Sequence, residues 1–308
     1  MSKIIVTGGA GFIGSTLVDR LIAAGHDVRV IDDLSSGKRE YLNPNALLYQ
    51  DDIRSPEIAG IFQKEQPEYV FHLAAQIDVR KSMSDPLSDN EINVRGGLNI
   101  LEQSRLSGVK KFIFASTGGA VYGDAEEIPT TESYPPYPLS FYGIHKLTFE
   151  KYLNCYRRVY GLDYTILRFA NVYGPRQYKG GEAGVVAIFT DNAVRGRESA
   201  QYGDGQQTRD FVYVDDVVRA LELAKDIACP NEINIGTGVE SSLLDVRKAI
   251  EEALGTALKI RQEPAKSGEQ LRSCLSPRRA KEVLGWEPQI DLAAGIRLTV
   301  DWAQEQSK

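Results

Sequence analysis

The sequence predicts an α/β fold in which a doubly wound parallel sheet carries a smaller C-terminal α/β lobe. Through the first two-thirds of the 308 residues, short β-branched runs alternate with longer segments in which apolar residues recur every three or four positions. A glycine-rich turn at residues 7–14 joins the first run to the first such segment. After Phe169, paired glycines and prolines break the chain into loops, which indicates that a second lobe begins there.

Five apolar runs are the expected strands of the sheet: residues 3–7, 28–32, 69–73, 111–116 and 164–169. Helical spacing predicts helices between the first two strands and at about 87–106, 142–160 and 184–195. A strand, a helix and another strand at about 209–234 should rejoin the sheet, and helical structure is expected from 241–254 onwards. The lobes are therefore expected to be interleaved, with 1–172 plus about 209–238 in one and about 173–208 plus 239–308 in the other.

Composition argues against several classes of function. The net charge of −6 and the isoelectric point near 5.3 offer no basic surface for a phosphate backbone, so nucleic acid is not an expected partner. The three cysteines, Cys155, Cys229 and Cys274, are far apart, which indicates buried or half-buried free thiols rather than a disulfide framework or a metal site. No leader-like segment or bilayer-spanning apolar run appears, so we expect a cytoplasmic protein with no membrane partner.

Residues 7–14 (TGGAGFIG) follow an expected strand and open an expected helix, which is the context of a Rossmann-type dinucleotide-binding loop. Gly8 permits a tight turn, Gly11 lets the backbone approach a pyrophosphate, and Gly14 lets the helix pack on the sheet. Asp32 follows 18 positions after Gly14, where its carboxylate would accept hydrogen bonds from ribose hydroxyls and repel a 2′-phosphate. This favours NAD over NADP as the cofactor, although Asp32 could instead simply start a loop.

Tyr142 and Lys146 are four residues apart at the start of an expected helix, so their side chains lie on one face. A tyrosine with an ordinary pKa of about 10 is a poor base at neutral pH, but a nearby cation favours its phenolate. The pair could therefore move a proton while a hydroxyl is oxidised. The third partner is expected to be a hydroxyl at the end of a middle strand, where Ser116 and Thr117 stand. Taken alone, the same spacing is common on amphipathic helix surfaces.

Together these motifs resemble the extended short-chain dehydrogenase/reductase family and, within it, the UDP-glucose and UDP-N-acetylglucosamine 4-epimerases. The resemblance also rests on 73–75 (LAA), 121–123 (VYG), 168–176 (RFANVYGPR), 209–216 (RDFVYVDD) and 284–288 (LGWEP). It implies an NAD-dependent UDP-hexose 4-epimerase, an isomerase that oxidises the sugar transiently at C4 and returns hydride to either face. The implied substrates are UDP-glucose and UDP-galactose. The implied assembly is a homodimer through a helical interface that includes the helix bearing Tyr142.

The resemblance also implies roles for individual residues. The NAD contacts would come from Gly8, Gly11, Phe12, Ile13, Asp32, Asp52, Ile53, Ala74 and Lys146. Asp52 and Ile53 would lie beside the adenine. Asn171 and Arg209 would hold the diphosphate of the substrate, Arg209 through a charge-assisted contact. The alternatives are that Asn171 only caps a turn and that Arg209 forms a surface ion pair.

The chain departs from the family pattern near the expected catalytic residues. The loop after Ser116 and Thr117 is one residue longer than usual, at Gly118 and Gly119. The catalytic hydroxyl therefore stays open between Thr117 and Ser116, and Thr117 is preferred. His145 occupies a position that is often serine, and we expect its side chain to face solvent.

A second departure lies in the C-terminal lobe, which is expected to bind the substrate. Residues 266–269 (KSGE) stand where Arg-Pro-Gly-Asp/Glu is common, so Lys266, three residues before Glu269, would replace a bidentate arginine with a point charge. Arg272 is a candidate to compensate. Ser273 lies four residues after Glu269, at a position that resembles a gatekeeper beside the 2-substituent of the sugar. A serine there leaves room for an N-acetyl group, unless another side chain closes the site.

Four other functions share this fold. A sugar-nucleotide 4,6-dehydratase is disfavoured because Gly118 to Ala120 stand where it commonly has an Asp-Glu pair. A UDP-glucuronate 4-epimerase or decarboxylase stays open, with Arg80 or Lys81 as candidate partners of the substrate carboxylate. A reductase would need an exchangeable cofactor. A non-catalytic NAD-binding regulatory protein is opposed by the complete set of Tyr142, Lys146 and a strand-end hydroxyl.

Overall fold

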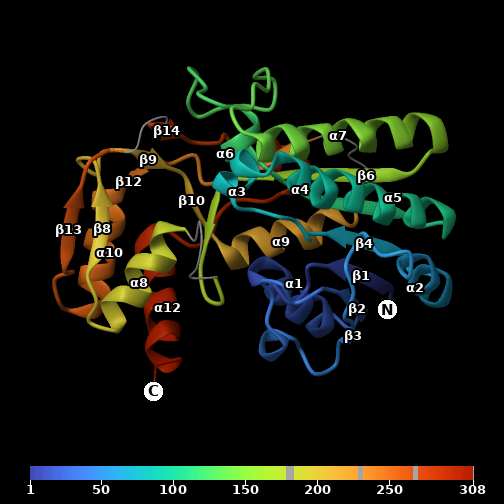
Figure 1. Ribbon diagram of the computed structural model, residues 1–308, viewed down its shortest axis with the longest axis horizontal. Helices are drawn as coiled ribbons and strands as arrows, with labels where there is room; N and C mark the ends of the chain where they lie inside the picture. The colour runs from blue at the N-terminus through green and yellow to red at the C-terminus, as the bar shows by residue number, and fades with distance from the viewer. Residues whose placement is uncertain (178–183, 228–231, 266–269, 308) are drawn as a thin grey trace.

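The computed structural model describes residues 1–177, 184–227, 232–265 and 270–307. Its centre is a seven-stranded sheet in the order β11-β6-β5-β4-β1-β2-β3, and every neighbouring pair is parallel (Figure 1). The strands are β1 (Lys3–Thr7), β2 (Asp27–Ile31), β3 (Leu47–Tyr49), β4 (Tyr69–His72), β5 (Lys111–Thr117), β6 (Asp163–Phe169) and β11 (Glu232–Ile235). The strand order reverses between β1 and β4, which creates the switch point where ligands bind in such sheets.

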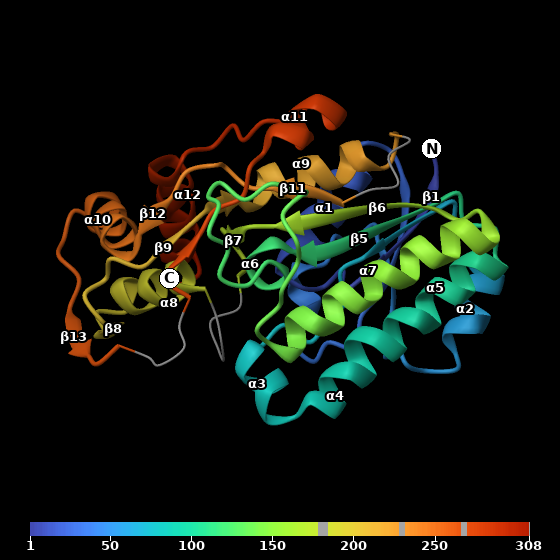
Figure 2. The ribbon, with the colours of Figure 1, turned by 90° about the horizontal axis from the view of Figure 1, so that it is seen from above.

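Helices cover both faces of this sheet, as Figure 2 shows. One face carries α1 (Phe12–Ala23), α9 (Val214–Ala224) and α11 (Arg278–Leu284). The other carries α2 (Ile58–Glu65), α5 (Gly97–Leu106) and α7 (Phe141–Tyr160). Ile4 and Val6 of β1 enter one buried cluster and Ile5 enters the other, because successive side chains of a strand point to opposite faces. The predicted doubly wound α/β fold is thereby confirmed.

A smaller group of elements lies at the left of Figure 1. Its helices are α8 (Val185–Val194), α10 (Leu243–Leu254) and α12 (Leu292–Glu305), which pack on one another. Its strands are β8 (Ser199–Tyr202), β9 (Thr208–Arg209), β12 (Ser241–Ser242), β13 (Ile260–Glu263) and β14 (Arg272–Ser273). We propose that this group is the smaller lobe and that the chain divides between the lobes as the sequence predicts, except that α11 packs against β11 and α9 of the larger lobe.

The expectation that both strands near 209–234 rejoin the central sheet is wrong for the first of them. β10 (Phe211–Tyr213) pairs instead with β7 (Asn171–Tyr173) in a separate two-stranded sheet. The reason is that β11 occupies the place beside β6, and the N–H of Ala170 still donates to the carbonyl of Ile235 at 2.9 Å. β10 is left to pair with the chain after the end of β6.

Short elements account for most other differences from the prediction. The expected helix at 87–106 is divided into α4 (Pro86–Asn90), a π-helix η2 (Glu91–Gly96) and α5. The unpredicted short elements include η1 (Arg39–Tyr41), α3 (Val79–Ser84) and α6 (Gly118–Val121).

Cys155 is exposed, contrary to expectation, Cys274 is buried, and Cys229 lies outside the described residues. No helix in the described ranges is long and apolar enough to cross a bilayer.

Candidate active site

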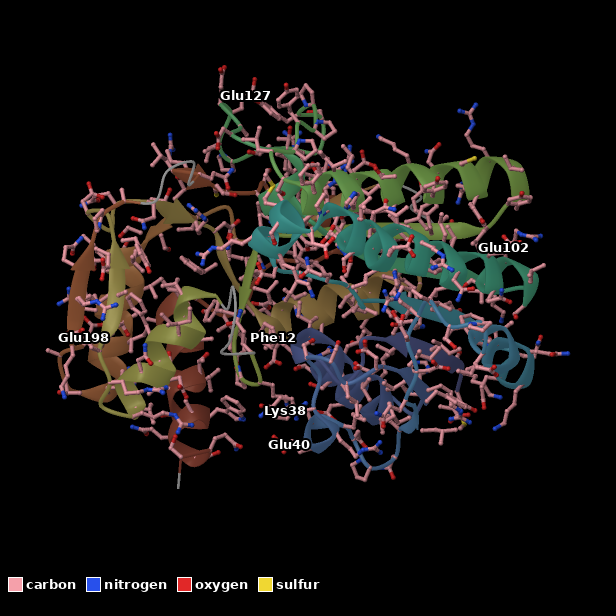
Figure 3. The ribbon with its side chains drawn as sticks, in the orientation of Figure 1. Phe12, Lys38, Glu40, Glu102, Glu127 and Glu198 are labelled. Atoms are coloured by element: carbon pink, nitrogen blue, oxygen red, sulfur yellow. The ribbon has the colours of Figure 1, made fainter. Side chains whose placement is uncertain are left out.

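The glycine-rich loop forms a close-packed turn between β1 and α1. Gly8 has a φ of +71°, and a Cβ there would lie 2.6 Å from the backbone nitrogen of Ala74. A Cβ on Gly14 would lie 2.0 Å from the carbonyl oxygen of Gly8. The first turn of α1 begins at Phe12, at the end of the helix that faces the smaller lobe (Figure 3). The first N–H groups of an α-helix have no partner within the helix, so this helix start can receive a phosphate, and the glycines of the turn let it approach.

Asp32 is fixed at the end of β2 beside this loop. Its carboxylate accepts hydrogen bonds from the N–H groups of Ala10 and Leu34, each at 2.9 Å. The residue is 7% exposed, and burial raises the pKa of its carboxyl, which the two N–H donors oppose. Each carboxylate oxygen can accept further hydrogen bonds, so Asp32 can hold the loop and still receive ribose hydroxyls.

The other residues expected around the adenine and the cofactor follow β3 and β4. Asp52 pairs with Arg54, whose guanidinium lowers the pKa of that carboxyl. Ile53 is buried, and the side chain of Asn99 donates to its carbonyl at 2.8 Å. The N–H of Ala74 donates to the hydroxyl of Thr7 at 3.2 Å, which ties the end of β4 to the end of β1. β3 and β4 belong to one parallel sheet, so the residues that follow their carboxyl ends lie at the same edge of the sheet.

Tyr142 and Lys146 lie in the first turns of α7. The Ser140 hydroxyl caps this helix by accepting from the N–H of Gly143 at 3.1 Å, and the N–H of Tyr142 donates to Ser82 at 3.1 Å. Lys146 is 4% exposed and its Nζ donates to the carbonyl of Ala115 at 2.7 Å. That ammonium lies 6.0 Å from the centroid of the Tyr142 ring, so the expected pairing on one helix face is present.

Burial moves the pKa values of both groups away from their ordinary range. The pKa of Lys146 falls to about 8 because of desolvation, against the opposing charges of Glu150 and Asp89. Desolvation and the charge of Asp89 both raise the pKa of the Tyr142 hydroxyl. A phenolate at Tyr142 therefore needs positive charge beside it, and Lys146 is placed to provide it.

The two strand-end hydroxyls have different surroundings. Ser116 is buried, and its Oγ donates to the carboxylate of Glu150 at 2.6 Å. Thr117 is half-buried, and its Oγ1 accepts from the N–H of Ala120 at 3.2 Å, which caps α6. The Ser116 hydroxyl therefore already has an acceptor inside the protein, whereas accepting a hydrogen bond leaves the Thr117 proton for another group.

A buried polar network lies behind these hydroxyls and was not predicted. Glu150 forms an ion pair with Arg168, with oxygen–nitrogen distances of 2.5 and 3.0 Å. Arg168 also donates to the hydroxyl of Tyr122 at 2.8 Å, and Tyr122 donates to Asn234 at 2.9 Å. The only hint in the sequence is that Glu150 follows Lys146 by one helical turn.

His145 does not face solvent, contrary to expectation. Its side chain is 12% exposed, and its Nδ1 lies 2.5 Å from a carboxylate oxygen of Asp89, whose side chain is fully buried. The expectation failed because α4, which carries Asp89, packs against the start of α7. Nothing in the spacing of the two residues along the chain signals this contact.

Two of the expected substrate-binding residues meet in the three-stranded sheet β12-β9-β14. Arg209 of β9 and Ser273 of β14 are register partners in a parallel pair, and Ser273 is 9% exposed. Ser273 also lines a pocket with Gly118 and Tyr122, which follow Thr117 in the chain. The fold therefore brings Ser273 close to the end of β5.

The remaining candidate substrate-binding residues make contacts within the protein or lie outside the described residues. Asn171 is exposed at the start of β7, and its N–H donates to the carbonyl of Asp210 at 2.9 Å. The guanidinium of Arg209 donates to the carbonyl of Thr208 at 2.8 Å. Arg272 is paired with Glu240 at 2.5 and 2.9 Å, so its suggested part as a substitute diphosphate ligand is opposed by this ion pair. Lys266 and Glu269 lie outside the described residues.

The comparisons with known proteins agree with this arrangement. Residues 4–236 match the model of the NAD dependent epimerase/dehydratase family. The chain belongs to this family. A family member from Mycolicibacterium smegmatis, a UDP-glucose 4-epimerase, is 46% identical over 99% of this chain and 100% of its own.

Solved structures of family members are similar over the same length. A UDP-glucose 4-epimerase of Thermotoga maritima, solved with UDP-glucose, has a TM-score of 0.97 and 49% identity over 99% of this chain and 100% of its own. A UDP-glucose 4-epimerase of Thermus thermophilus, solved as a complex with NAD, has a TM-score of 0.94 and 43% identity over 98% of each chain. The family resemblance inferred from the motifs is thereby confirmed.

Proposed function

We propose that this protein is an NAD-dependent UDP-hexose 4-epimerase that interconverts UDP-glucose and UDP-galactose. The observation that carries the proposal is the pair of half-buried Tyr142 and buried Lys146, set beside a strand-end hydroxyl at the carboxyl edge of the sheet. Its similarity to UDP-glucose 4-epimerases along nearly the whole chain supports the same reaction.

The cofactor proposed is NAD, and the described residues fit it. A Cβ has no room at Gly8 or Gly14 because backbone atoms of the protein lie there, as the tight turn and the close helix packing of a dinucleotide-binding loop require. Asp32 would accept from the adenosine ribose and would repel the 2′-phosphate of NADP. The remaining contacts are assigned to Phe12, Ile13, Asp52, Ile53, Ala74 and Lys146. When bound, NAD supplies reversible acceptance of a hydride from C4 of the sugar.

Proton transfer is assigned to Tyr142. Its phenolate would take the proton of the 4-hydroxyl and later return it, while Lys146 stabilises the phenolate by its charge. Thr117 would donate a hydrogen bond to the same sugar oxygen, because the hydroxyl of Ser116 is engaged by Glu150. Inversion requires the sugar to turn while its diphosphate stays anchored. Asn171 and Arg209 are the proposed anchors, with Lys266 and Glu269 as further candidates outside the described residues.

Ser273 is the proposed determinant of substrate scope. Its side chain lines a pocket with Gly118. A serine takes up less space at this position than an aromatic residue would, so UDP-N-acetylglucosamine and UDP-N-acetylgalactosamine should also be substrates. Turnover of UDP-N-acetylglucosamine by the wild type and by Ser273→Tyr tests this. We expect the variant to lose this substrate and to keep UDP-glucose; a wild type that does not turn over the N-acetylated sugar would exclude the proposal.

The proposed reaction is tested with purified protein and a panel of UDP-sugars, with products resolved by NMR. UDP-galactose should form from UDP-glucose. A product only from UDP-glucuronate would favour the 4-epimerase or decarboxylase of that sugar, and no product from any of them would favour a non-catalytic NAD-binding protein. The Tyr142→Phe variant should keep its NAD and lose turnover, and full activity in that variant would overturn the assigned mechanism.

We also propose that the protein is a homodimer through α7. Exposed apolar side chains recur along one side of this helix at Phe141, Ile144, Tyr152 and Val159, with exposed fractions of 36 to 63%. Two copies that place these stripes together would bury them. Light scattering should give the mass of a dimer, and Ile144→Lys with Val159→Lys should give a monomer. A wild-type monomer would exclude the proposal.

A cytoplasmic location remains an expectation from the sequence.

A further inference from the structure

A buried Asp–His pair lies directly beside the proposed proton-transfer residues. Asp89, in α4, is 1% exposed. Its carboxylate lies 2.5 Å from Nδ1 of His145 and accepts from Nε2 of Gln76 at 2.6 Å. Gln76 is in turn held by Asn93, which exchanges two hydrogen bonds of 2.9 Å with its backbone. The carboxylate is therefore fixed in place, and a histidine is in direct contact with it.

The pair is close enough to act on Tyr142 and Lys146 electrostatically. Positions 142, 145 and 146 of α7 are three and four residues apart, so they share one side of the helix. α4 packs against this helix. The charge of Asp89 raises both the pKa of Tyr142 and the pKa of Lys146. Burial leaves little solvent to screen that charge.

We propose that Asp89 and His145 form a charge-tuning pair that sets how readily Tyr142 becomes a phenolate. With His145 neutral, the pair carries one negative charge and opposes the phenolate. With His145 protonated, the pair is neutral overall and the phenolate is favoured. Both residues act through Tyr142 and are positioning residues, and the inference rests on the proton-transfer role proposed for Tyr142.

The consequence is that the protein keeps its activity to lower pH. As the pH falls, Tyr142 would ordinarily gain a proton and lose its activity as a base. Histidine is the side chain that changes charge between about pH 5 and 8. Protonation of His145 as the pH falls would remove the charge that opposes the Tyr142 phenolate.

The other charged groups around the start of α7 are placed differently. Arg80 and Lys81 of α3 are exposed, and Glu91 of η2 forms an exposed ion pair with Arg95. Behind Lys146, Glu150 is paired with Arg168. His72 is buried, and desolvation followed by the charge of Lys146 lowers its pKa to about 3, so it stays neutral in the working range. Among the described groups packed against this helix start, Asp89 is thus the buried carboxylate that is paired with a histidine.

The test is the pH dependence of kcat/KM for UDP-glucose in three variants. Asp89→Asn removes the charge that opposes the phenolate, so the acid limb of the pH profile of kcat/KM should move to lower pH by on the order of one unit. His145→Gln keeps a hydrogen-bond donor but cannot gain a charge, so the acid limb should move to higher pH. Glu91→Gln, which removes an exposed carboxylate from the neighbouring element, is the matched control and should leave the limb in place. The inference would be overturned if the acid limbs of Asp89→Asn and His145→Gln moved in the same direction, or if the variants only lost kcat uniformly across the pH range.

A second measurement does not depend on turnover or on stable variants. The chain has three histidines, so proton NMR of the wild type can follow each imidazole. A His145 signal that titrates between about pH 5 and 8 supports the pair, and a signal that stays constant overturns it. Failure of the proposed function looks different. Full activity in Tyr142→Phe would remove the mechanism itself, whereas an inactive Tyr142→Phe with unshifted limbs in Asp89→Asn and His145→Gln would remove only this inference.

Discussion

Replacement of Glu150 by glutamine should strongly destabilise the protein. Glu150 and Arg168 are buried, with side-chain exposures of 3% and 2%, and they form a bidentate ion pair. Glutamine would leave the guanidinium with Glu232, at 4.0 Å and 35% exposed, as its remaining acidic neighbour among the described residues. Removal of one partner from a buried pair costs about 3–5 kcal/mol. We expect about 3 kcal/mol, because the amide can still accept from Ser116 and Glu232 offsets part of the charge.

Urea unfolding followed by circular dichroism measures this free energy. Glu91→Gln is the matched control, since it removes one partner of an exposed pair on a helix and should cost at most about 0.5 kcal/mol. The double variant Glu150→Leu with Arg168→Met should cost less than Glu150→Gln, because it buries no unpaired charge. A loss below about 1 kcal/mol for Glu150→Gln would refute the argument that the network depends on this pair.

Three further predictions concern the cofactor site and the core. Gly14→Ala should weaken NAD binding at least about tenfold, because its Cβ would meet the Gly8 oxygen at 2.0 Å; an unchanged dissociation constant by calorimetry would be inconsistent with the packed loop. Asp32→Ser should bring the affinities for NAD and NADP together, and a variant that still prefers NAD as strongly as the wild type would count against the ribose contact. His72 has a folded pKa of about 3, below its ordinary value of 6.5, so its contribution to stability is present above pH 6.5 and is lost as pH falls towards 3, at up to about 1.4 kcal/mol per unit. His72→Gln should reduce this slope in urea unfolding between those values, and equal slopes would argue against a buried neutral imidazole.

The cofactor half of the fold was predictable because its signals are local. Ile4, Ile5 and Val6 form a continuous apolar run, as a strand buried on both faces requires. The turn at residues 7–14 needs glycine where backbone atoms approach one another, and the four-residue spacing of Tyr142 and Lys146 places them on one helix face. Each of these features is contained within one element or one turn.

The features that escaped prediction depend on contacts between distant parts of the chain. Asp89 and His145 are 56 residues apart, and Ser116 and Glu150 are 34 apart, so no local pattern links them. The smaller lobe was indistinct for another reason. Its strands β9, β12 and β14 have two residues each, which is too short for an alternating pattern to show.

The central claim is that the protein oxidises the sugar at C4 and reduces it again within one closed site. The direct test is to incubate the purified protein with UDP-glucose deuterated at C4, without added NAD, and to analyse the product by NMR and mass spectrometry. The account predicts UDP-galactose that keeps its deuterium at C4, because the hydrogen that leaves the sugar stays in the site. UDP-galactose that has exchanged this deuterium for solvent hydrogen, or no UDP-galactose at all, would contradict it.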